Sequence, residues 1–255
     1  MSWRCAVLAL LVASACGRVD FGSPLDGGVA PDAVPDGTTF DDICKRDGVT
    51  VCETFEGNTA TNWDFTGAPL PVVTPTLSYG TGHSLLSVGG AQMQSSYLTS
   101  RLIDPIPTPS FYSRAWVYLP SADTIGHVNL ITLDSDMGGY SLVAIDDDPG
   151  TGPEPVIELY TDAKIGPMDI GTAPRDRWFC VELQVDLADP NGHVKGTVDS
   201  GGPMERSTQN SGRTTLPPLK YLYLGASFSG PNQAADLHVY IDDFLLGRDP
   251  VGCYP

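Results

Sequence analysis

The chain has 255 residues, a formal net charge of −17 at pH 7, 28 glycines and 22 prolines. Abundant glycine and proline, together with the lack of any sustained amphipathic helical pattern, predict a β-rich domain rather than a helical one. Only 14 Lys and Arg residues stand against 31 Asp and Glu residues, and they are scattered. This balance argues against binding to nucleic acid and against electrostatic adhesion to anionic lipid, because both need clustered basic side chains.

The N-terminus of the chain has the pattern of an export signal. Arg4 provides a positive charge, residues 6–12 are apolar, and residues 13–15 are small. The stretch that ends at Cys16 resembles a bacterial lipobox, in which the peptide is cut before the cysteine and the cysteine is acylated. The resemblance implies a lipid-anchored protein, and Gly17 after the cysteine implies sorting to the outer membrane, facing the periplasm or the cell surface. The alternative is an ordinary cleaved signal in which Cys16 has no such role.

Residues 16–43 are rich in Asp, Pro and Gly and contain little that could form a core. Such a composition is typical of a solvated tether. We therefore expect a signal peptide over residues 1–15, a tether over 16–43 and one folded domain over 44–255.

Four cysteines fall within the expected domain: Cys44, Cys52, Cys180 and Cys253. In an exported domain they predict two disulfides, which could form in three connectivities. The turn signal Asp47-Gly48 lies between the first two cysteines, so a short hairpin could join Cys44 to Cys52. This favours Cys180 with Cys253 as the second pair. No two cysteines have the spacing of a CxxC metal or redox motif.

About twelve short runs of alternating or apolar residues are separated by turn residues, and each run predicts a β-strand. In chain order the main runs are residues 51–57, 80–88, 97–103, 111–119, 127–133, 140–145, 156–161, 177–186, 193–199, 219–228 and 238–247. Acidic loops at 134–136 and 146–148 lack the glutamate of an EF-hand and are interpreted as turns. The pattern predicts an all-β fold, a two-sheet antiparallel sandwich.

Two of these runs alternate strongly enough to assign faces. In 111–119 the side expected in the core carries Phe111, Ala115, Val117 and Leu119, and the outward side carries Tyr112, Arg114, Trp116 and Tyr118. In 177–186 the outward residues are Trp178, Cys180, Glu182 and Gln184. Flat rings beside polar groups are what a sugar-binding surface needs. We therefore predict one concave binding face formed by Arg114, Trp116, Tyr118, Tyr160, Trp178, Glu182 and Gln184. The alternative for Trp116 is packing under a loop.

The last run, 238–247, places Asp242 and Asp243 among β-branched and aromatic residues. Charges are depleted from strands, so this pair needs a partner or an ion. The expected partner strand is 51–57, at the other end of the domain. By alternation, Asp243 shares a face with three apolar neighbours, Val239, Ile241 and Leu245.

Several motifs resemble the concanavalin A-like or LamG-like jelly roll. They are Glu-Thr-Phe-Glu-Gly at 53–57, Trp63, Gly-His-Ser-Leu at 82–85, Arg-Ala-Trp-Val at 114–117 and Val-Asp at 198–199. The resemblance implies a jelly-roll β-sandwich in which the first and last strands pair antiparallel. It also implies a structural calcium held by Glu56, Asp242 and backbone carbonyls near Gly57 and Gly82. The alternative is a hydrogen-bonded buried carboxylate pair with no metal.

Catalytic signatures are weak. Glycosidases of this fold carry a Glu-x-Asp-x-x-Glu or Glu-x-Asp-x-Glu strand, and neither pattern occurs in the sequence. Glu158 and Glu182 form a candidate acid pair only if their strands are neighbours. Alginate lyases of the fold use Arg, Gln, His and Tyr, and the matching residue types here are Arg114, Gln184, His127 and Tyr118. No Gly-x-Ser-x-Gly elbow or phosphate loop is present.

Together these patterns predict a lipid-anchored envelope protein whose single jelly-roll domain binds polysaccharide or a surface glycan without turnover, with calcium as a structural cofactor. One alternative is a polysaccharide lyase or glycoside hydrolase of the same fold. Another is a structural or adhesive surface module that binds protein.

Overall fold

A computed structural model describes much of the chain between residues 39 and 253. The described ranges are 39–57, 60, 62–80, 82–90, 94–106, 110–136, 140–148, 152–160, 165–186, 193–199, 204–207, 218–228 and 236–253. For residues 103–106, 140–142, 146–148, 152–160, 165–167, 193, 204–207 and 228 the description is limited to the backbone. The expected signal peptide, Cys16 and most of the expected tether lie outside the described residues.

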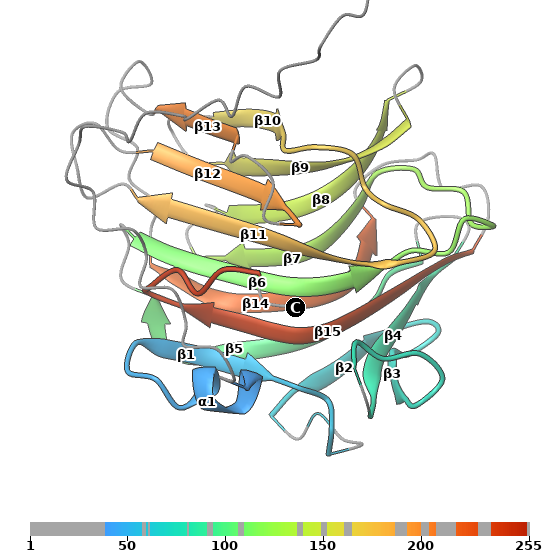
Figure 1. Cartoon of the computed structure of the whole chain (residues 1–255), viewed down its shortest axis with the longest axis horizontal. Coiled ribbons are helices and arrows are strands. Elements are labelled where there is room, and N and C mark those ends of the chain that lie inside the picture. Colours follow the sequence, from blue (N-terminus) through green and yellow to red (C-terminus); the bar gives the residue numbers. More distant parts are fainter. Residues whose placement is uncertain are drawn as a thin grey trace, which may run out of the picture. The chain divides into compact units, whose positions relative to one another are not determined.

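Two antiparallel sheets make up a jelly-roll sandwich (Figure 1). Sheet A contains, in order, β13 (Met204–Ser207), β12 (His193–Val198), β11 (Trp178–Asp186), β6 (Ser110–Tyr118), β15 (Leu237–Gly247), β4 (Ser84–Gly89) and β3 (Val72–Thr74), and β1 (Val49–Glu53) also pairs with β15. Sheet B contains, in order, β10 (Ile165–Asp169), β9 (Gly152–Tyr160), β8 (Tyr140–Asp148), β7 (Val128–Asp134), β14 (Leu219–Phe228), β5 (Ser96–Ile106) and β2 (Asp64–Gly67). The prediction of an all-β antiparallel sandwich is therefore confirmed.

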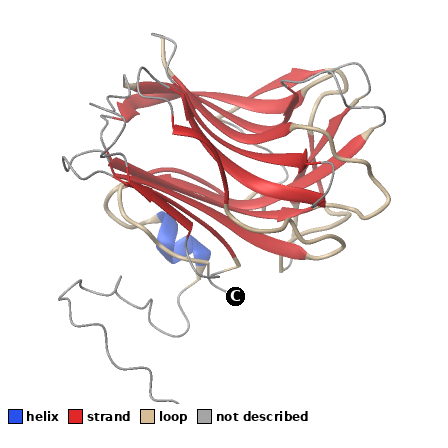
Figure 2. Cartoon of the chain, turned by 90° about the horizontal axis from the view of Figure 1, so that it is seen from above, coloured by secondary structure: helices blue, strands red, loops and turns tan. Residues whose placement is uncertain are grey.

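The main core lies between the sheets, which Figure 2 shows as two layers. The alternating residues of β6 and β11 meet there as predicted, because strand side chains point to opposite faces in turn. The core members from these two strands are Phe111, Ala115, Val117, Phe179, Val181, Leu183 and Val185. Ser87 of β4 also joins the sheets, since its hydroxyl accepts a hydrogen bond from the backbone N–H of Ala226 in β14 (2.8 Å).

A second, smaller cluster covers part of the outer face of sheet A. It consists of Ile43, Tyr112, Leu245 and Val251, with Phe40, Val49 and Cys52 packed against them. Ile43 and Phe40 belong to the short helix α1 (Phe40–Cys44), whose capping box is formed by Thr39 and Asp42. The helix therefore begins four residues before the expected start of the domain at residue 44. Within the described residues α1 is the one helix, and no helix there is both long and apolar enough to cross a membrane.

Both expected disulfides are present, and each joins a segment outside sheet A to a strand of that sheet. Cys44 bonds to Cys52, which joins α1 to β1. Cys180 bonds to Cys253, which joins β11 to the C-terminal segment. These bonds hold α1 and the C-terminal segment against the outer face of sheet A.

The antiparallel pairing of the first and last strands is also confirmed. Val51 pairs with Leu246 and Glu53 pairs with Phe244. The strand ends at Glu53 rather than at Gly57, because Phe55 takes a left-handed conformation with φ 58°. The carboxylate of Glu53 stabilises this turn by accepting a hydrogen bond from the backbone N–H of Phe55 (3.1 Å).

Four short strands were not predicted from the sequence: β2, β3, β10 and β13. They have three to five residues each, which is too short for a clear alternation to emerge. In addition, β5 continues through Asp104 and Pro105 to Ile106, where the sequence predicted an end.

Candidate functional site

The register between β6 and β11 brings most of the predicted binding residues to the outer face of sheet A. Trp178 lies opposite Tyr118, and Glu182 lies opposite Arg114. Trp116 lies between them on the same face of β6. Residues that face each other across antiparallel strands have side chains on one surface, so the outward parity predicted for these strands is correct.

The predicted exposure of this face is wrong for two of its residues. Arg114 is only 1% exposed and Trp116 only 8% exposed. Arg114 is covered because its Nη1 donates to the carbonyl of Gly252 (3.0 Å) and its guanidinium lies 4.7 Å from the ring centre of Phe40. Trp116 is covered by Tyr79, from the loop before β4. Segments from elsewhere in the chain thus hide the middle of the face, and Trp116 packs under a loop.

Five aromatic rings lie next to one another on the outer face of sheet A. We call Tyr79, Trp116, Trp178, Tyr118 and Tyr240 the ring strip. The ring centres are 3.8 Å apart for Tyr79 and Trp116, 6.1 Å for Tyr79 and Trp178, 5.8 Å for Tyr118 and Trp178, and 6.0 Å for Tyr118 and Tyr240. Four of the five rings are half-buried, so each still presents part of its surface. The strip therefore spans a loop and three strands.

Two donors of the ring strip have no acceptor within the described part of the chain. They are the buried indole N–H groups of Trp116 and Trp178. A buried donor without a partner is costly, so indoles that lie beside a surface commonly donate to water or to a ligand oxygen. Both nitrogens are themselves buried, so a ligand would reach them only if the side chains around them moved.

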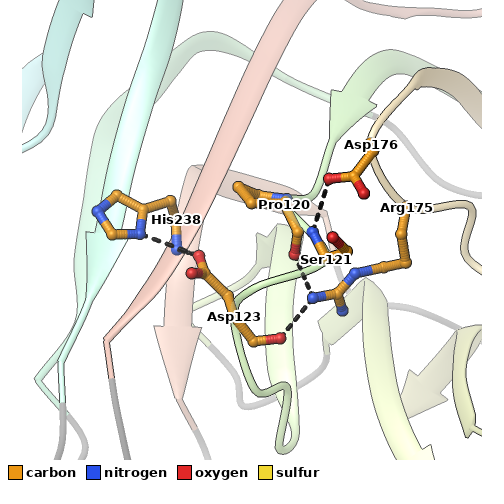
Figure 3. A network of polar contacts seen from close by, with 6 residues as sticks. All are labelled: Pro120, Ser121, Asp123, Arg175, Asp176 and His238. Carbon is orange, nitrogen blue, oxygen red and sulfur yellow. Dashed lines mark hydrogen bonds and ion pairs between the residues drawn. The ribbon is translucent and has the colours of Figure 1, made fainter.

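A network of polar contacts joins the loop after β6, the segment before β11 and the start of β15 (Figure 3). The strand-end network consists of Pro120, Ser121, Asp123, Arg175, Asp176 and His238. Arg175 donates to the carbonyls of Pro120 and Asp123. The carboxylate of Asp123 accepts from the backbone N–H of His238 (2.6 Å) and lies 2.9 Å from Nδ1 of the same residue. These bonds tie the loop after β6 to the start of β15.

Each strand that carries a half-buried ring also contributes to the strand-end network or adjoins it. The pairs, two residues apart in the sequence, are Tyr118 with Pro120, Asp176 with Trp178, and His238 with Tyr240. Asp176 accepts from the backbone N–H of Ser121 (2.8 Å) and has a left-handed φ of 57°. The network therefore fixes the strand ends from which these three rings project.

The polar part of the predicted face is held in internal hydrogen bonds. Both carboxylate oxygens of Glu182 are engaged, one by the hydroxyl of Tyr112 and the other by the hydroxyl of Thr197 (2.5 Å). Burial, followed by the adjacent Glu182 carboxylate, raises the pKa of Tyr112 well above its usual value. The Tyr112 hydroxyl also accepts from the backbone N–H of Gly252 (3.1 Å). Glu182 is thus part of the contact that seats the C-terminal segment.

Two predicted residues of interest are separated from this face by the topology. Tyr160 and Glu158 lie in β9, and β9 belongs to sheet B. Tyr160 therefore does not join the predicted face, and Glu158 cannot form an acid pair with Glu182 on one sheet. The sequence could not reveal this, because the assignment of strands to sheets depends on long-range pairing.

The residue types that suggested a lyase are also divided. Arg114, Tyr118 and Gln184 lie on sheet A, whereas His127 directly precedes β7 of sheet B. His127 Nε2 contacts the side-chain oxygen of Asn129 (3.1 Å). The four residues thus do not form one constellation.

Two rings of the strip were missed in the sequence analysis. Tyr240 could have been found, because it shares the outward parity of His238 and Asp242 in β15. Tyr79 lies in a loop, where no alternation predicts a direction. Its position depends on Asp242, whose Oδ2 accepts the backbone N–H of Tyr79 (2.9 Å).

A β-bulge explains the two aspartates of the last strand. Asp242 pairs with Trp116 and Leu245 pairs with Arg114, so Asp243 and Phe244 together oppose a single residue of β6. Asp243 has a left-handed φ of 45°. The expectation that Asp243 shares a face with Leu245 is therefore wrong.

The bulge reverses the alternation beyond it. Phe244 now points into the main core, and Leu245 joins the cluster under α1. Asp243 itself is half-buried. Its partial exposure to water helps the strand to tolerate this carboxyl group.

Burial makes ionisation of the two aspartates at the bulge unfavourable. Burial, with the nearby charges of Asp243 and Glu56, raises the pKa of Asp242 to about 8. Burial also raises the pKa of Asp243 to about 6, with Arg114 opposing the shift and Glu56 adding to it. Such shifts indicate that negative charge here is unfavourable without a further cation.

The geometry of the predicted ligands partly fits a calcium ion. Glu56 approaches Gly82 so closely that a Cβ at Gly82 would lie 1.6 Å from its Oε2, and Gly82 has a φ of 114°. Among the described residues, however, no group of three or more Asp, Glu, His or Cys side chains converges as a metal site. A calcium ion would therefore need backbone oxygens, as predicted for Gly57 and Gly82, to complete the roughly six to eight ligands it prefers.

The comparisons with known proteins bear on the fold. No protein-family model matches the chain, and no curated protein sequence matches it. The cellulose-induced protein Cip1 has 16% identity and a TM-score of 0.56, over 80% of this chain and 100% of that one. The alginate lyase vAL-1 from Chlorella virus has 11% identity and a TM-score of 0.53, over 78% of this chain and 99% of that one. The binding domain of botulinum neurotoxin serotype D/C has 11% identity and a TM-score of 0.57, over 81% of this chain and 50% of that one.

These similarities define the class of protein by its architecture. The chain is similar to jelly-roll β-sandwiches over about four-fifths of its length. At such low identity the similarity concerns the fold alone.

Proposed function

We propose that this jelly-roll domain binds glycan without turning it over, and that the ring strip on the outer face of sheet A is the contact surface. The observation that carries this proposal is the continuous set of ring contacts through Tyr79, Trp178, Tyr118 and Tyr240, four residues that are each only half-buried. Pyranose rings have apolar faces that stack on flat aromatic rings, while their hydroxyls need donors and acceptors nearby.

The structural neighbours support the class of ligand. Two of the neighbours are alginate lyases, one is a cellulose-induced protein, and one is from botulinum neurotoxin type C, whose cell entry depends on interaction with two ganglioside molecules. These proteins share the sandwich at low identity. The main support for glycan binding by this chain is therefore its own aromatic rings.

The arrangement of acidic and lyase-type residues favours binding over catalysis. The candidate acid pair lies on two different sheets, and the carboxylate of Glu182 is engaged by Tyr112 and Thr197. A retaining glycosidase needs two carboxyl groups about 5 Å apart on one face. The competing functions are a polysaccharide lyase and a protein-binding adhesive module. A glycan array read beside an activity assay separates both from glycan binding without turnover.

We also propose that the mature protein begins at a lipidated Cys16 and is held in the outer membrane by its acyl chains. The support is the sequence pattern before this cysteine and the acidic Pro- and Gly-rich stretch after it. Multiple acyl chains provide a durable anchor, since each buried methylene adds about 0.8 kcal/mol.

A structural calcium is proposed beside the bulge, with Glu56 and Asp242 as carboxylate ligands. The support is the raised pKa of Asp242, which reflects negative charge that a cation would offset. The ion would connect the turn after β1 to β15.

The deciding experiment is a glycan array probed with the folded domain, read beside an assay for the absorbance of unsaturated uronate products. Binding without product supports the proposed function. Product formation would assign a lyase, and neither binding nor product would favour a protein-binding module.

A further inference from the structure

The cations nearest the ring strip are already engaged within the protein. Arg114 is buried, with its Nη1 bonded to the carbonyl of Gly252 and its guanidinium over the ring of Phe40. Arg177, which precedes Trp178 in β11, places its Nη1 2.7 Å from Oδ2 of Asp199. The charge of Arg177 is thus balanced by the carboxylate of Asp199, and Arg114 is buried away from the surface of the face.

The strand-end network engages two further basic residues, Arg175 and His238. Arg175 is directed at the carbonyl oxygens of Pro120 and Asp123 (Figure 3). His238 contacts the carboxylate of Asp123 through Nδ1 (2.9 Å). The Asp123 side chain is itself 13% exposed.

Lys195 lies too far from Trp178 along sheet A to compensate a negative charge placed there. It pairs with Gln184, and Gln184 is six residues along β11 from Trp178. In an extended strand that separation corresponds to roughly 20 Å, well beyond the Debye length in physiological salt.

Carboxylates act on two tyrosines of the strip, Tyr240 and Tyr79. Burial, followed by the charge of Asp123, raises the pKa of Tyr240. Burial likewise raises the pKa of Tyr79; the buried Arg114 opposes this shift, and Asp243 and Asp199 add to it. Carboxylates therefore lie near the strip both at Tyr240 and at Tyr79.

We propose that the ring strip is specific for neutral glycans and rejects polyuronates and other anionic polysaccharides. This inference rests on the proposed glycan-binding function and names its substrate class. The rings provide stacking surfaces for uncharged pyranose units, and the arginines beside them are paired with groups of the protein itself. A sugar carboxylate placed on the strip would therefore lie near carboxylates, and the arginines described beside the strip already have partners within the protein.

The test compares two probes of equal length on the folded domain by isothermal titration calorimetry: a neutral hexasaccharide such as cellohexaose or laminarihexaose, and a hexamer of mannuronate. We expect the neutral hexamer to bind about tenfold more tightly or better, because like-charge juxtaposition weakens association. Equal or tighter binding of mannuronate would overturn the substrate class and leave glycan binding intact. If neither hexamer binds, the proposed function fails as well.

One substitution sharpens this test. Asp199→Asn removes the partner of Arg177, while an asparagine can keep the left-handed φ of 53° and still accept the backbone N–H of Cys180 (2.9 Å). We expect the variant to gain about threefold in affinity for mannuronate, with a stronger salt dependence, and to keep its affinity for the neutral hexamer.

The matched control is Asp64→Asn, which removes the same charge from an exposed position in β2 of sheet B. It should leave both affinities unchanged. An equal gain for the two variants would mean that net charge alone controls the preference, and it would overturn the assignment to the ring strip.

Discussion

The ring of Tyr79 lies on the indole of Trp116, with ring centres 3.8 Å apart and planes 12° apart. The loop that carries Tyr79 is held there by Asp242, whose carboxylate accepts the backbone N–H of Tyr79. A carboxylate of the last strand therefore positions an aromatic ring of the candidate binding surface. The same stack hides Trp116 and leaves Trp178 as the more accessible indole of the strip.

The first prediction concerns Trp178. Replacing it with alanine should weaken glycan affinity by about 2 kcal/mol, or roughly 30-fold, because a central aromatic anchor of an interface typically contributes this much. Calorimetry with the neutral hexamer measures the loss, and thermal melting shows whether the domain stays folded.

The matched control for this prediction is Tyr223→Ala. Tyr223 is a half-buried tyrosine of β14 in sheet B, and its ring centre lies 5.6 Å from that of Tyr97. If Tyr223→Ala reduced affinity and Trp178→Ala did not, the binding surface would lie on sheet B instead.

The second prediction is that Arg114 stabilises the fold and does not contact ligand. Arg114→Ala removes the bond to Gly252 and the contact with Phe40, and it leaves a cavity in a fully buried position. We expect a loss of about 3 kcal/mol in the free energy of unfolding, measured by urea denaturation. Reduced glycan affinity at unchanged stability would instead make Arg114 a ligand contact.

The third prediction is a pH dependence of stability set by Asp242. Its pKa in the folded protein, about 8, exceeds the ordinary value of 3.8, so the folded state binds the proton more tightly than the unfolded state. The resulting stabilisation is complete below the ordinary value and is lost as the pH rises through the folded value. The melting temperature of chelator-treated protein should therefore fall between about pH 5 and pH 8.

Calcium should offset this fall. An ion that binds only the folded state stabilises it by mass action, and the carboxylates are available to it above their pKa values. Added calcium should raise the melting temperature near pH 8 and have little effect near pH 5, where Asp242 is protonated. Asp242→Asn should abolish the calcium effect and the fall in melting temperature between about pH 6 and pH 8, while the pH dependence set by Asp243 should remain up to about pH 6. A calcium-independent melting curve at both pH values would leave the first and last strands held by packing and hydrogen bonds alone.

The fourth prediction compares the two disulfides. Cys180 and Cys253 are 73 residues apart in the sequence, and Cys44 and Cys52 are 8 apart. Chain-entropy estimates give roughly 4 kcal/mol for the longer loop and about 2.5 kcal/mol for the shorter one. Urea denaturation of the two double serine variants should therefore show the larger loss for Cys180→Ser/Cys253→Ser, and the reverse order would show that strain or residual structure dominates.

The fifth prediction concerns the anchor. Wild-type protein should be recovered in the membrane fraction with an acylated N-terminal Cys16, and Cys16→Ser should move it to the soluble fraction because the acyl chains cannot be attached. Mass spectrometry of the N-terminal peptide checks the modification. A mature protein that starts at another residue would remove the argument for outer-membrane localisation.

The sequence by itself determined the architecture and several of its contacts. Alternation in 111–119 and 177–186 identified the core face of two central strands, because the side-chain period of a strand is a local property. The pairing of the first and last strands and both disulfides were also foreseen. Alternation also indicated the outward direction of Trp178, Tyr118 and Glu182.

The tertiary structure alone decided which outward residues remain accessible. Arg114 and Trp116 are outward in their strand, yet they are buried by Phe40, Gly252 and Tyr79, which lie far from them in the sequence. No periodicity encodes such a cover, because it depends on where loops and chain ends pack.

Two further predictions from the sequence failed because they depended on how distant strands pair. Glu158 and Tyr160 were separated from sheet A by pairings between distant strands, and Asp243 left the alternation because a single left-handed residue shifts the register of β15 against β6. Long-range pairing and a one-residue insertion both change which face a side chain takes without changing the local pattern that predicts it.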